Sequence, residues 1–297
     1  MLDLDQLQRK SDRMQWSLAD IDWEAPGAER VSPELAARLT GFMGDLHWIE
    51  QIAAVVFEAM ARTTDRDDHR RLFQAFAVEE QRHADAELAL MVRWGMVAPG
   101  SRPRPNANAE KLLETLTVHA GKVHPSVFAA VIPLNELVLD GALVKYLGRS
   151  VDDPVCHQVF HHINADEARH LAMDFHVLEH YGREFSGMSN LLDLLRTAVR
   201  PANLYALFFG YLPMVSRVVG PAGSIRQMGL SHDEVARSLQ RFQDLGRRNP
   251  HIARHPAYQL FASYARATVD DGRDIGHALM RLSDVVDRLG GRGRAAA

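Results

Sequence analysis

The chain has 297 residues, of which 46% are hydrophobic and 24% charged, so it can bury a sizeable core and is not of disordered composition. Its formal net charge of -4 provides no basic surface for nucleic acid, and we expect no nucleic-acid partner. The single cysteine, Cys156, excludes an internal disulfide framework and a cysteine-based zinc or iron–sulfur site.

Residues 1–31 are predicted to form an N-terminal arm. Their beginning, MLDLDQLQRKSDRMQW, has no apolar run of signal-peptide length, which predicts a cytoplasmic protein. Helix starts are indicated by SPEL, with Ser32 at an N-cap and Pro33 in the first turn, and by DDPV, with Asp153 and Pro154 in the same roles. Helix ends are predicted at three glycines that follow periodic runs: Gly95, Gly148 and Gly182.

The chain is predicted to be all-α, because apolar residues recur at spacings of three and four nearly throughout. Four long helices are expected at residues 33–62, 67–94, 125–148 and 154–181, each about 36–45 Å long. The Pro-rich stretch GMVAPGSRPRPNANAE and a short helix near residues 110–120 separate the second helix from the third. Such a long crossover would make these two helices parallel, which predicts a ferritin-like four-helix bundle over residues 32–185.

Residues 186–290 are predicted to form a C-terminal helical extension packed on this bundle, with helix starts near Ser231 and Val269, and residues 291–297 a disordered tail. Within the extension, PANLYALFFGYLPMVSRVVG (residues 201–220) is strongly apolar until Pro213 and Arg217 interrupt it. The run is shorter than the roughly 20 apolar residues of a spanning helix, so we expect no membrane span. A buried helix, a cover over an apolar pocket and the interface of a homodimer all remain open for it.

A ten-residue pattern occurs twice, as VEEQRHADAE from Val78 and as ADEARHLAMD from Ala165. In each copy a glutamate precedes a histidine by three residues, which places the two side chains on one side of a helix. A carboxylate and an imidazole at this spacing can ligate one metal ion, and iron and manganese accept this mixture of ligands. Two such pairs on the second and fourth helices predict a metal site, with the pairs being Glu80 with His83 and Glu167 with His170.

A two-metal carboxylate site needs one further glutamate from each of the other two helices. Glu50 lies thirty residues before Glu80, and Glu136 lies thirty-one before Glu167, so each helical hairpin would bring its acids to one height. Both Glu50 and Glu136 interrupt apolar runs, where an unpaired charge is costly. Glu58 is the alternative to Glu50, although its shorter separation from Glu80 breaks the symmetry. A helix interior held by salt bridges without a metal is the alternative for the whole set.

An acid–arginine pair accompanies each motif. Glu79 with Arg82, and Asp166 with Arg169, are three residues apart and turned about 100° away from the metal-facing side. From there the carboxylates could reach the neighbouring helix and orient the opposite histidine through its free ring N–H. The alternative is two ordinary surface pairs, which contribute little to stability.

The segments EEQRH and DEARH resemble the paired [D/E]-E-x-R-H motifs of ferritin-like di-iron carboxylate enzymes. That group includes the soluble acyl-carrier-protein desaturases, the hydroxylase subunits of bacterial multicomponent monooxygenases and the arylamine N-oxygenases. The resemblance covers about residues 33–181. It implies two iron ions held by six residues of this chain: Glu50, Glu80, His83, Glu136, Glu167 and His170.

The same resemblance implies that the two irons activate dioxygen as a co-substrate, with a mixed manganese–iron pair as the alternative. It also implies an external electron donor, such as a reductase or a ferredoxin. The arylamine N-oxygenases add a third histidine one turn before the second motif, where this chain has Ile163. The ribonucleotide reductase small subunit places a radical tyrosine four residues after the first motif's histidine, where this chain has Glu87.

Three further acids lie near the predicted ligands. Glu87 and Asp174 follow each motif's glutamate by seven residues, nearly back on the metal-facing stripe, where they would hold waters or relay protons, or simply cap the end of the bundle. Asp140, one turn after Glu136, stands where similar monooxygenase hydroxylases carry a threonine beside the dioxygen site. We predict that Asp140 delivers protons during oxygen activation; the alternative is an aspartate on the helix surface.

The function implied by the resemblance is that of a di-iron oxygenase or oxidase. It would hydroxylate, desaturate or N-oxygenate an organic small molecule, which could be apolar or bound to a carrier protein. These reactions share one metal apparatus and differ in how a pocket presents the substrate. The alternatives are a non-catalytic ferritin-like protein that stores or buffers iron, and a purely structural helical bundle.

Overall fold

The computed structural model describes residues 2–123, 125–138, 145–184 and 223–270, together with Tyr211, Met214 and Val218. All regular elements within these residues are helices, so the predicted all-α class is confirmed for them. The α-helices are α1 (Leu4–Arg13), α2 (Pro33–Thr63), α3 (Asp67–Arg93), α4 (Ala107–His119), α5 (Pro125–Val138), α6 (Lys145–Ser150), α7 (Pro154–Glu184), α11 (Ser224–Gln227), α12 (His232–Arg247), α13 (Pro250–Ala253) and α14 (Pro256–Asp270). The 3-10 helices are η1 (Leu18–Asp20), η2 (Ala28–Arg30) and η3 (Ala120–Lys122).

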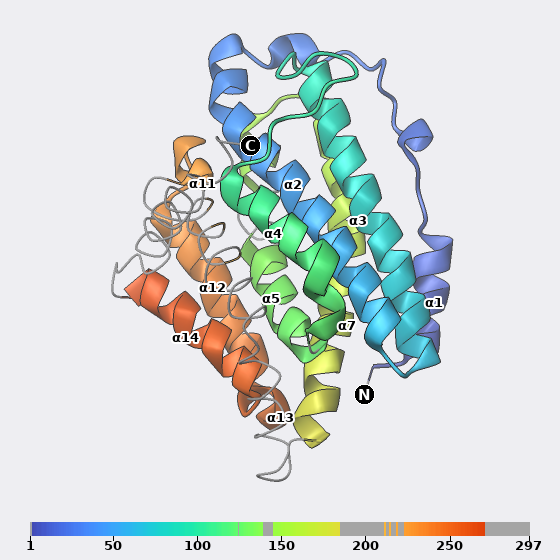
Figure 1. The fold of residues 1–297 in the computed structure, drawn as a ribbon. Helices are drawn as coiled ribbons and strands as arrows, with labels where there is room; N and C mark the ends of the chain where they lie inside the picture. The colour runs from blue at the N-terminus through green and yellow to red at the C-terminus, as the bar shows by residue number, and fades with distance from the viewer. Residues whose placement is uncertain are drawn as a thin grey trace, which may run out of the picture.

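Helices α2, α3, α5 and α7 pack against one another at the centre of the molecule (Figure 1). The hairpin of α2 and α3 buries a run of phenylalanines, and Phe57 meets Phe73 and Phe76 with ring centroids 6.1 and 5.5 Å apart. All three rings are fully buried. Burying such a side chain stabilises a fold by about 1.5–3 kcal/mol. The apolar packing of this hairpin can therefore offset the cost of burying polar side chains elsewhere on α2 and α3.

The chain crosses over between α3 and α5. Trp48 of α2 donates its indole N–H to the carbonyl of Pro103 at 3.0 Å, which ties the crossover to the middle of α2. Helix α4 then runs along α2 to η3, where Gly121 lies beside Thr63, the last residue of α2. Helix α5 therefore begins at the end of the molecule where α3 begins, and the two run parallel (Figure 1).

The predicted helix starts at residues 33 and 154 are confirmed. The side chain of Ser32 accepts a hydrogen bond from a backbone N–H of the first turn of α2 at 3.2 Å, and Pro33 follows as the first helical residue. Asp153 does the same for α7 at 3.1 Å, with Pro154 as the first residue. Both caps satisfy donors that have no partner inside the helix.

Only one of the three predicted helix ends is correct. Helix α3 ends two residues before Gly95, whose φ of +68° is the left-handed conformation that glycine favours. Helix α6 instead continues two residues past Gly148, and α7 continues two residues past Gly182. At Gly182 the lack of a side chain serves packing, because a Cβ there would lie 2.4 Å from the carbonyl oxygen of His251 in α13. The middle of the predicted third helix, residues 139–144, lies outside the described residues.

The N-terminal arm follows the outer side of α3 and α7 (Figure 1). Helix α1 turns Leu7 and Ser11 into the protein, where both are buried. Farther on, Arg93 at the end of α3 donates to the carbonyls of Trp23 and Ala25, each at 2.6 Å. These contacts hold the arm against the two helices that carry the repeated motif.

The C-terminal helices α12 and α14 pack against α5, and α13 packs against α7. The predicted start at Ser231 is confirmed, because Ser231 and Glu234 form a reciprocal capping box at the start of α12. The predicted start near Val269 is wrong, since α14 begins at Pro256 and runs through that position. Burial of Tyr258 and neighbouring apolar residues gives the helix its earlier start.

The apolar stretch at residues 201–220 is described only at Tyr211, Met214 and Val218, and all three are buried. The rest of this stretch, and the predicted tail at residues 291–297, lie outside the described residues. Within the part of the chain that the structure describes, no helix has the length and apolar character needed to cross a membrane.

Candidate metal centre

The structure brings the six predicted ligands together between the four central helices. Each residue is at most 7% exposed, although all six side chains can carry a charge that water would solvate better. They come from all four helices: Glu50 from α2, Glu80 and His83 from α3, Glu136 from α5, and Glu167 and His170 from α7.

The six residues form two overlapping groups whose ligand atoms lie within 4.8 Å of one another. The first group, here called the His83 position, consists of Glu50, Glu80, His83 and Glu167. The second, called the His170 position, consists of Glu80, Glu136, Glu167 and His170. Both groups contain Glu80 and Glu167, and a carboxylate with two oxygens can hold two neighbouring ions. Glu58, the alternative to Glu50, is instead exposed and pairs with Arg62 at 3.3 Å.

Both histidines turn the same ring nitrogen toward the acids. His83 Nδ1 lies 3.0 Å from Glu167, and His170 Nδ1 lies 3.0 Å from Glu80 and 3.2 Å from Glu167. Each imidazole thus reaches an acid of the opposite motif. Nδ1 is therefore the nitrogen available to a metal ion, and Nε2 is left for a hydrogen bond behind it.

Burial strongly perturbs the acids of this cluster. Burial raises the pKa of Glu136 well above its usual range, and repulsion from Glu167 raises it further. For Glu50, burial and repulsion from Glu80 have the same effect on the pKa. Burial opposes ionisation of Glu80 as well, but hydrogen bonds from its neighbours, Glu50 first among them, hold its pKa below the usual value. Several carboxylates cannot remain ionised side by side without a compensating positive charge.

Several ligand atoms are buried without a hydrogen-bond partner. They include both carboxylate oxygens of Glu136, Glu80 Oε2 and His83 Nδ1. A buried polar atom without a partner costs on the order of 1–3 kcal/mol, and more for a charged group. A cation between these atoms would satisfy them and offset the negative charge, so the residues present fit a bound metal ion.

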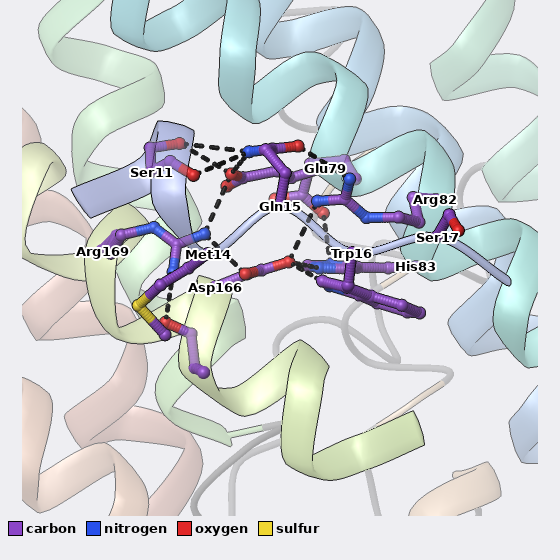
Figure 2. A network of polar contacts seen from close by, with 12 residues as sticks. Ser11, Met14, Gln15, Trp16, Ser17, Glu79, Arg82, His83, Asp166 and Arg169 are labelled. Atoms are coloured by element: carbon purple, nitrogen blue, oxygen red, sulfur yellow. Dashed lines mark hydrogen bonds and ion pairs between the residues drawn. The ribbon is translucent and has the colours of Figure 1, made fainter. Parts of the chain in front are cut away.

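The acids beside the motif glutamates contact the histidines of the opposite helix. Asp166 of α7 lies 3.0 Å from His83 Nε2, and Glu79 of α3 lies 2.8 Å from His170 Nε2. With Nε2 protonated, each histidine donates to its carboxylate and leaves Nδ1 free for a ligand bond. Arg169 lies between the two acids and donates to Asp166 at 2.5 Å and to Glu79 at 2.9 Å (Figure 2).

The two arginines of the motifs differ from one another. Arg169 contacts the aspartate of its own motif, as the sequence spacing predicts. The expected pairing of Arg82 with Glu79 is wrong, because Arg82 donates instead to Asp166 at 3.3 Å and to Gln15 at 2.8 Å. Both acids are buried, but the oxygens of Glu79 already contact Arg169 and His170, and Arg82 reaches across the interface of α3 and α7 to Asp166.

The N-terminal arm completes this network, which the motif spacing alone does not reveal. Ser11 and Gln15 donate to Glu79 Oε1 at 2.8 and 2.7 Å. Trp16 donates its indole N–H to Asp166 Oδ2 at 2.8 Å (Figure 2). These contacts join residues 68, 64 and 150 positions apart in the chain. Predicting them requires knowing the path of the arm, and no local pattern in the sequence marks it.

The remaining predicted residues divide into described and undescribed ones. Glu87 and Asp174 are both completely buried, so they are not exposed caps at the end of the helices. Burial raises the pKa of Asp174 well above its usual range. Ile163 is buried. Asp140 lies outside the described residues, so its predicted proton delivery stays a prediction.

Aromatic rings cover one side of His170. Phe76 lies with its ring centroid 4.3 Å from that of His170, and Phe57 lies 5.3 Å away in an edge-on arrangement. Both phenylalanines are fully buried. They exclude water from this side of the ligands, which strengthens the electrostatic interactions inside the cluster.

The arrangement can hold two metal ions in a buried cluster of four carboxylates and two imidazoles, with a hydrogen-bonded carboxylate behind each imidazole. Comparison with known proteins adds no relative to this description, since no protein-family model, curated protein or solved structure matches the chain significantly.

Proposed function

We propose that the protein is a ferritin-like, non-haem di-iron oxygenase or oxidase that uses dioxygen to hydroxylate, desaturate or N-oxygenate an organic small molecule. The observation that carries this proposal is the pair of overlapping ligand groups that have Glu80 and Glu167 in common. Two redox-active ions held at these groups would supply electrons together to dioxygen, which a single closed structural site would not. The repeated E-x-R-H motif on antiparallel α3 and α7 supports the same assignment.

The chemistry of the donor set favours iron, with a manganese–iron pair as the alternative. Carboxylate oxygens and imidazole nitrogens suit both metals, whereas thiolates are missing because the single cysteine of the chain is not part of the cluster. Four carboxylates around two ions can neutralise two divalent charges. That charge balance lowers the free-energy cost of burying a pair of ferrous ions.

The chain's own residues would have three roles in this reaction. Glu50 and Glu136 would each help to hold one ion, and Glu80 and Glu167, which belong to both groups, would help to hold both. Asp166 and Glu79 hold the proton on Nε2 of each histidine, which keeps the ring in the ligating tautomer. Phe57 and Phe76 exclude water from the side of His170, which would limit unproductive loss of the oxidant.

The described residues of the apolar stretch at 201–220 are Tyr211, Met214 and Val218, and all three are buried. Tyr211 within it lies 3.1 Å from the side chain of Asn135, the residue next to Glu136 on α5. Tyr211 also packs against Phe261 of α14. Buried apolar side chains beside the ligand helix support an apolar or carrier-bound substrate, because such side chains would desolvate it.

The test is anaerobic loading with ferrous iron, followed by exposure to dioxygen. The proposal expects about two irons per chain, consumption of oxygen and a magnetically coupled ferric pair detectable by Mössbauer spectroscopy. A Glu80→Ala variant should lose the coupled pair, since Glu80 belongs to both groups. Glu58→Ala is the matched control, because Glu58 is an exposed glutamate of α2, and it should behave like the wild type.

The same experiment distinguishes the rival function. A protein that stores iron would take up many more than two irons per chain, and it would do so in a large assembled particle visible by native mass spectrometry. Uptake of many irons, or an unchanged coupled pair in Glu80→Ala, would contradict the proposed oxygenase centre.

A further inference from the structure

The two metal positions have matching inner ligands. Each has one histidine that presents Nδ1, one glutamate of its own and the two glutamates that both positions contain. Each is also followed by one completely buried acid four residues beyond the histidine, namely Glu87 and Asp174. The inner residues therefore give no reason for one position to bind a metal more tightly than the other.

The carboxylates behind the histidines do not match. On Asp166, one oxygen, Oδ2, accepts from three donors: His83 at 3.0 Å, Trp16 at 2.8 Å and Arg82 at 3.3 Å. The other oxygen of Asp166 accepts from Arg169. The oxygen that orients His83 therefore also faces an indole N–H and a guanidinium.

Glu79 divides its donors differently between its two oxygens. Its Oε2 lies 2.8 Å from His170 Nε2 and is the oxygen that orients this histidine. Ser11, Gln15 and Arg169 donate instead to Oε1, at 2.8, 2.7 and 2.9 Å. Two of these three donors are neutral, so Glu79 contacts one guanidinium where Asp166 contacts two. Figure 2 shows Arg82 and Trp16 on the side of Asp166 and His83, and Ser11 and Gln15 on the side of Glu79.

This difference changes the donor strength of the two imidazoles. A carboxylate that accepts the proton of a ligating histidine makes the opposite ring nitrogen a stronger metal ligand. Cationic and N–H donors on the same carboxylate oxygen stabilise its charge and weaken its hold on that proton. His83 should therefore be the weaker ligand, which agrees with its longer contact to the carboxylate, 3.0 Å against 2.8 Å for His170.

We propose that the His170 position binds its metal ion first and more tightly, and that Arg82 is the positioning residue that weakens the His83 position through Asp166. The proposal rests on the proposed metal centre and adds an order of filling to it. Arg82 reaches no ligand directly: it donates to Asp166 and Gln15, and its guanidinium lies 5.0 Å from the centroid of the Trp16 ring. An unequal pair would load its two ions in sequence, which is also a way to take up two different metals.

The test is titration of the metal-free protein with Mn²⁺ alone, followed by calorimetry and by electron paramagnetic resonance. The wild type should show two steps whose affinities differ by about 10–100-fold, the usual range for changes in hydrogen bonding behind a ligand. The first equivalent should give the spectrum of isolated Mn²⁺, and the second should give a coupled pair. His83→Ala should keep the tighter step, and His170→Ala only the weaker one.

Substitutions of Arg82 provide the decisive comparison. Arg82→Gln removes the charge and should tighten the second step about tenfold while leaving the first within about twofold. Arg82→Lys keeps the charge and should retain the wild-type ratio between the Mn²⁺ affinities of the two steps. Gln15→Ala controls for the lost contact between Arg82 and Gln15. It should not make the two Mn²⁺ affinities more similar, because Gln15 donates to Glu79 and not to Asp166.

Three results would overturn the order of filling. They are a single class of equivalent Mn²⁺ sites in the wild type, retention of the tighter step by His170→Ala, and equal effects of Arg82→Gln and Arg82→Lys. Should the histidine variants fail to fold, the two Arg82 variants still decide, since the Arg82 side chain is 11% exposed at the edge of the network. Absence of any Mn²⁺ binding would contradict the metal centre itself as well as this order.

Discussion

At the scale of single residues, Arg169 joins two buried carboxylates of different helices. Its side chain is 1% exposed and donates to Glu79, to Asp166 and to the carbonyl of Ala165. Although Asp166 also contacts Arg82, Glu79 of α3 and Asp166 of α7 thus share one guanidinium. Its planar arrangement of donors can serve both at once, which a lysine could not do with the same geometry.

Replacing Arg169 by methionine should destabilise the metal-free protein by about 3–5 kcal/mol, because two buried carboxylates lose their common cation. The measurement is urea unfolding followed by circular dichroism. Arg183→Met is the matched control on the same helix, since Arg183 is 45% exposed in its pair with Glu179 and should contribute at most about 1 kcal/mol. Equal losses in the two variants would mean that the buried network contributes no special stability.

At the scale of elements, the close approach of α13 to α7 depends on the absence of a side chain at Gly182. Gly182 of α7 faces the backbone of α13 and leaves no room for a Cβ, which would meet His251 O at 2.4 Å. Gly41 of α2, by contrast, has no atom within 4 Å of the place of a Cβ. A side chain would therefore clash with a neighbouring helix at Gly182 but would be accommodated at Gly41.

Gly182→Ala should lower the free energy of unfolding by about 1–3 kcal/mol, because α13 must move away from α7 to accommodate the methyl group. Gly41→Ala should raise it by about 0.5–1 kcal/mol, since alanine favours an exposed helix interior. Thermal and urea unfolding of both variants check these signs. A stabilising Gly182→Ala would show that α13 does not pack closely on α7.

A second contact between elements involves histidines at the start of α3 and the end of α7. The ring of His69 lies 5.5 Å from that of His176 and 5.7 Å from that of His180, and Arg66 and Asp68 are its charged neighbours. Burial, together with the charge of Arg66, lowers the pKa of His69 to about 4. The folded protein thus keeps this imidazole neutral at neutral pH.

Acid should therefore weaken this contact. Between pH 6.5 and pH 4 the unfolded chain binds a proton on His69 that the folded protein does not, so the free energy of unfolding falls as pH falls. The full contribution is on the order of 3 kcal/mol, and it is present above pH 6.5. Urea unfolding across this range should give a shallower pH dependence for His69→Leu than for the wild type. If the free energy of unfolding depended on pH equally in the two proteins, His69 would not be the cause of the loss of stability in acid.

At the scale of the whole molecule, the sequence predicts the parts that depend on local patterns. The helix starts at Ser32, Asp153 and Ser231 follow from capping chemistry, and the long helices follow from apolar spacing. Symmetric separations of acids from the motifs distinguish Glu50, which lies in the cluster, from Glu58, which faces solvent. These features depend only on a few neighbouring residues or on the regular geometry of a helix.

The parts that the sequence does not predict depend on contacts between distant segments. The ends of α6 and α7 pass glycines that look like stop signals, and at Gly182 the cause is packing against α13. The start of α14 lies well before Val269 because its apolar side is buried against other helices. The donors from Ser11, Gln15 and Trp16 depend on the course of the whole N-terminal arm.

The proposed metal centre would hold two ions between α2, α3, α5 and α7, with Glu80 and Glu167 as ligands that both positions contain. Its most direct test is an anomalous difference map from a crystal of the protein grown with Mn²⁺ and measured above the manganese absorption edge. We expect two peaks about 3.5–4 Å apart, each next to Nδ1 of one histidine, His83 or His170. A single peak, or peaks away from these residues, would contradict it.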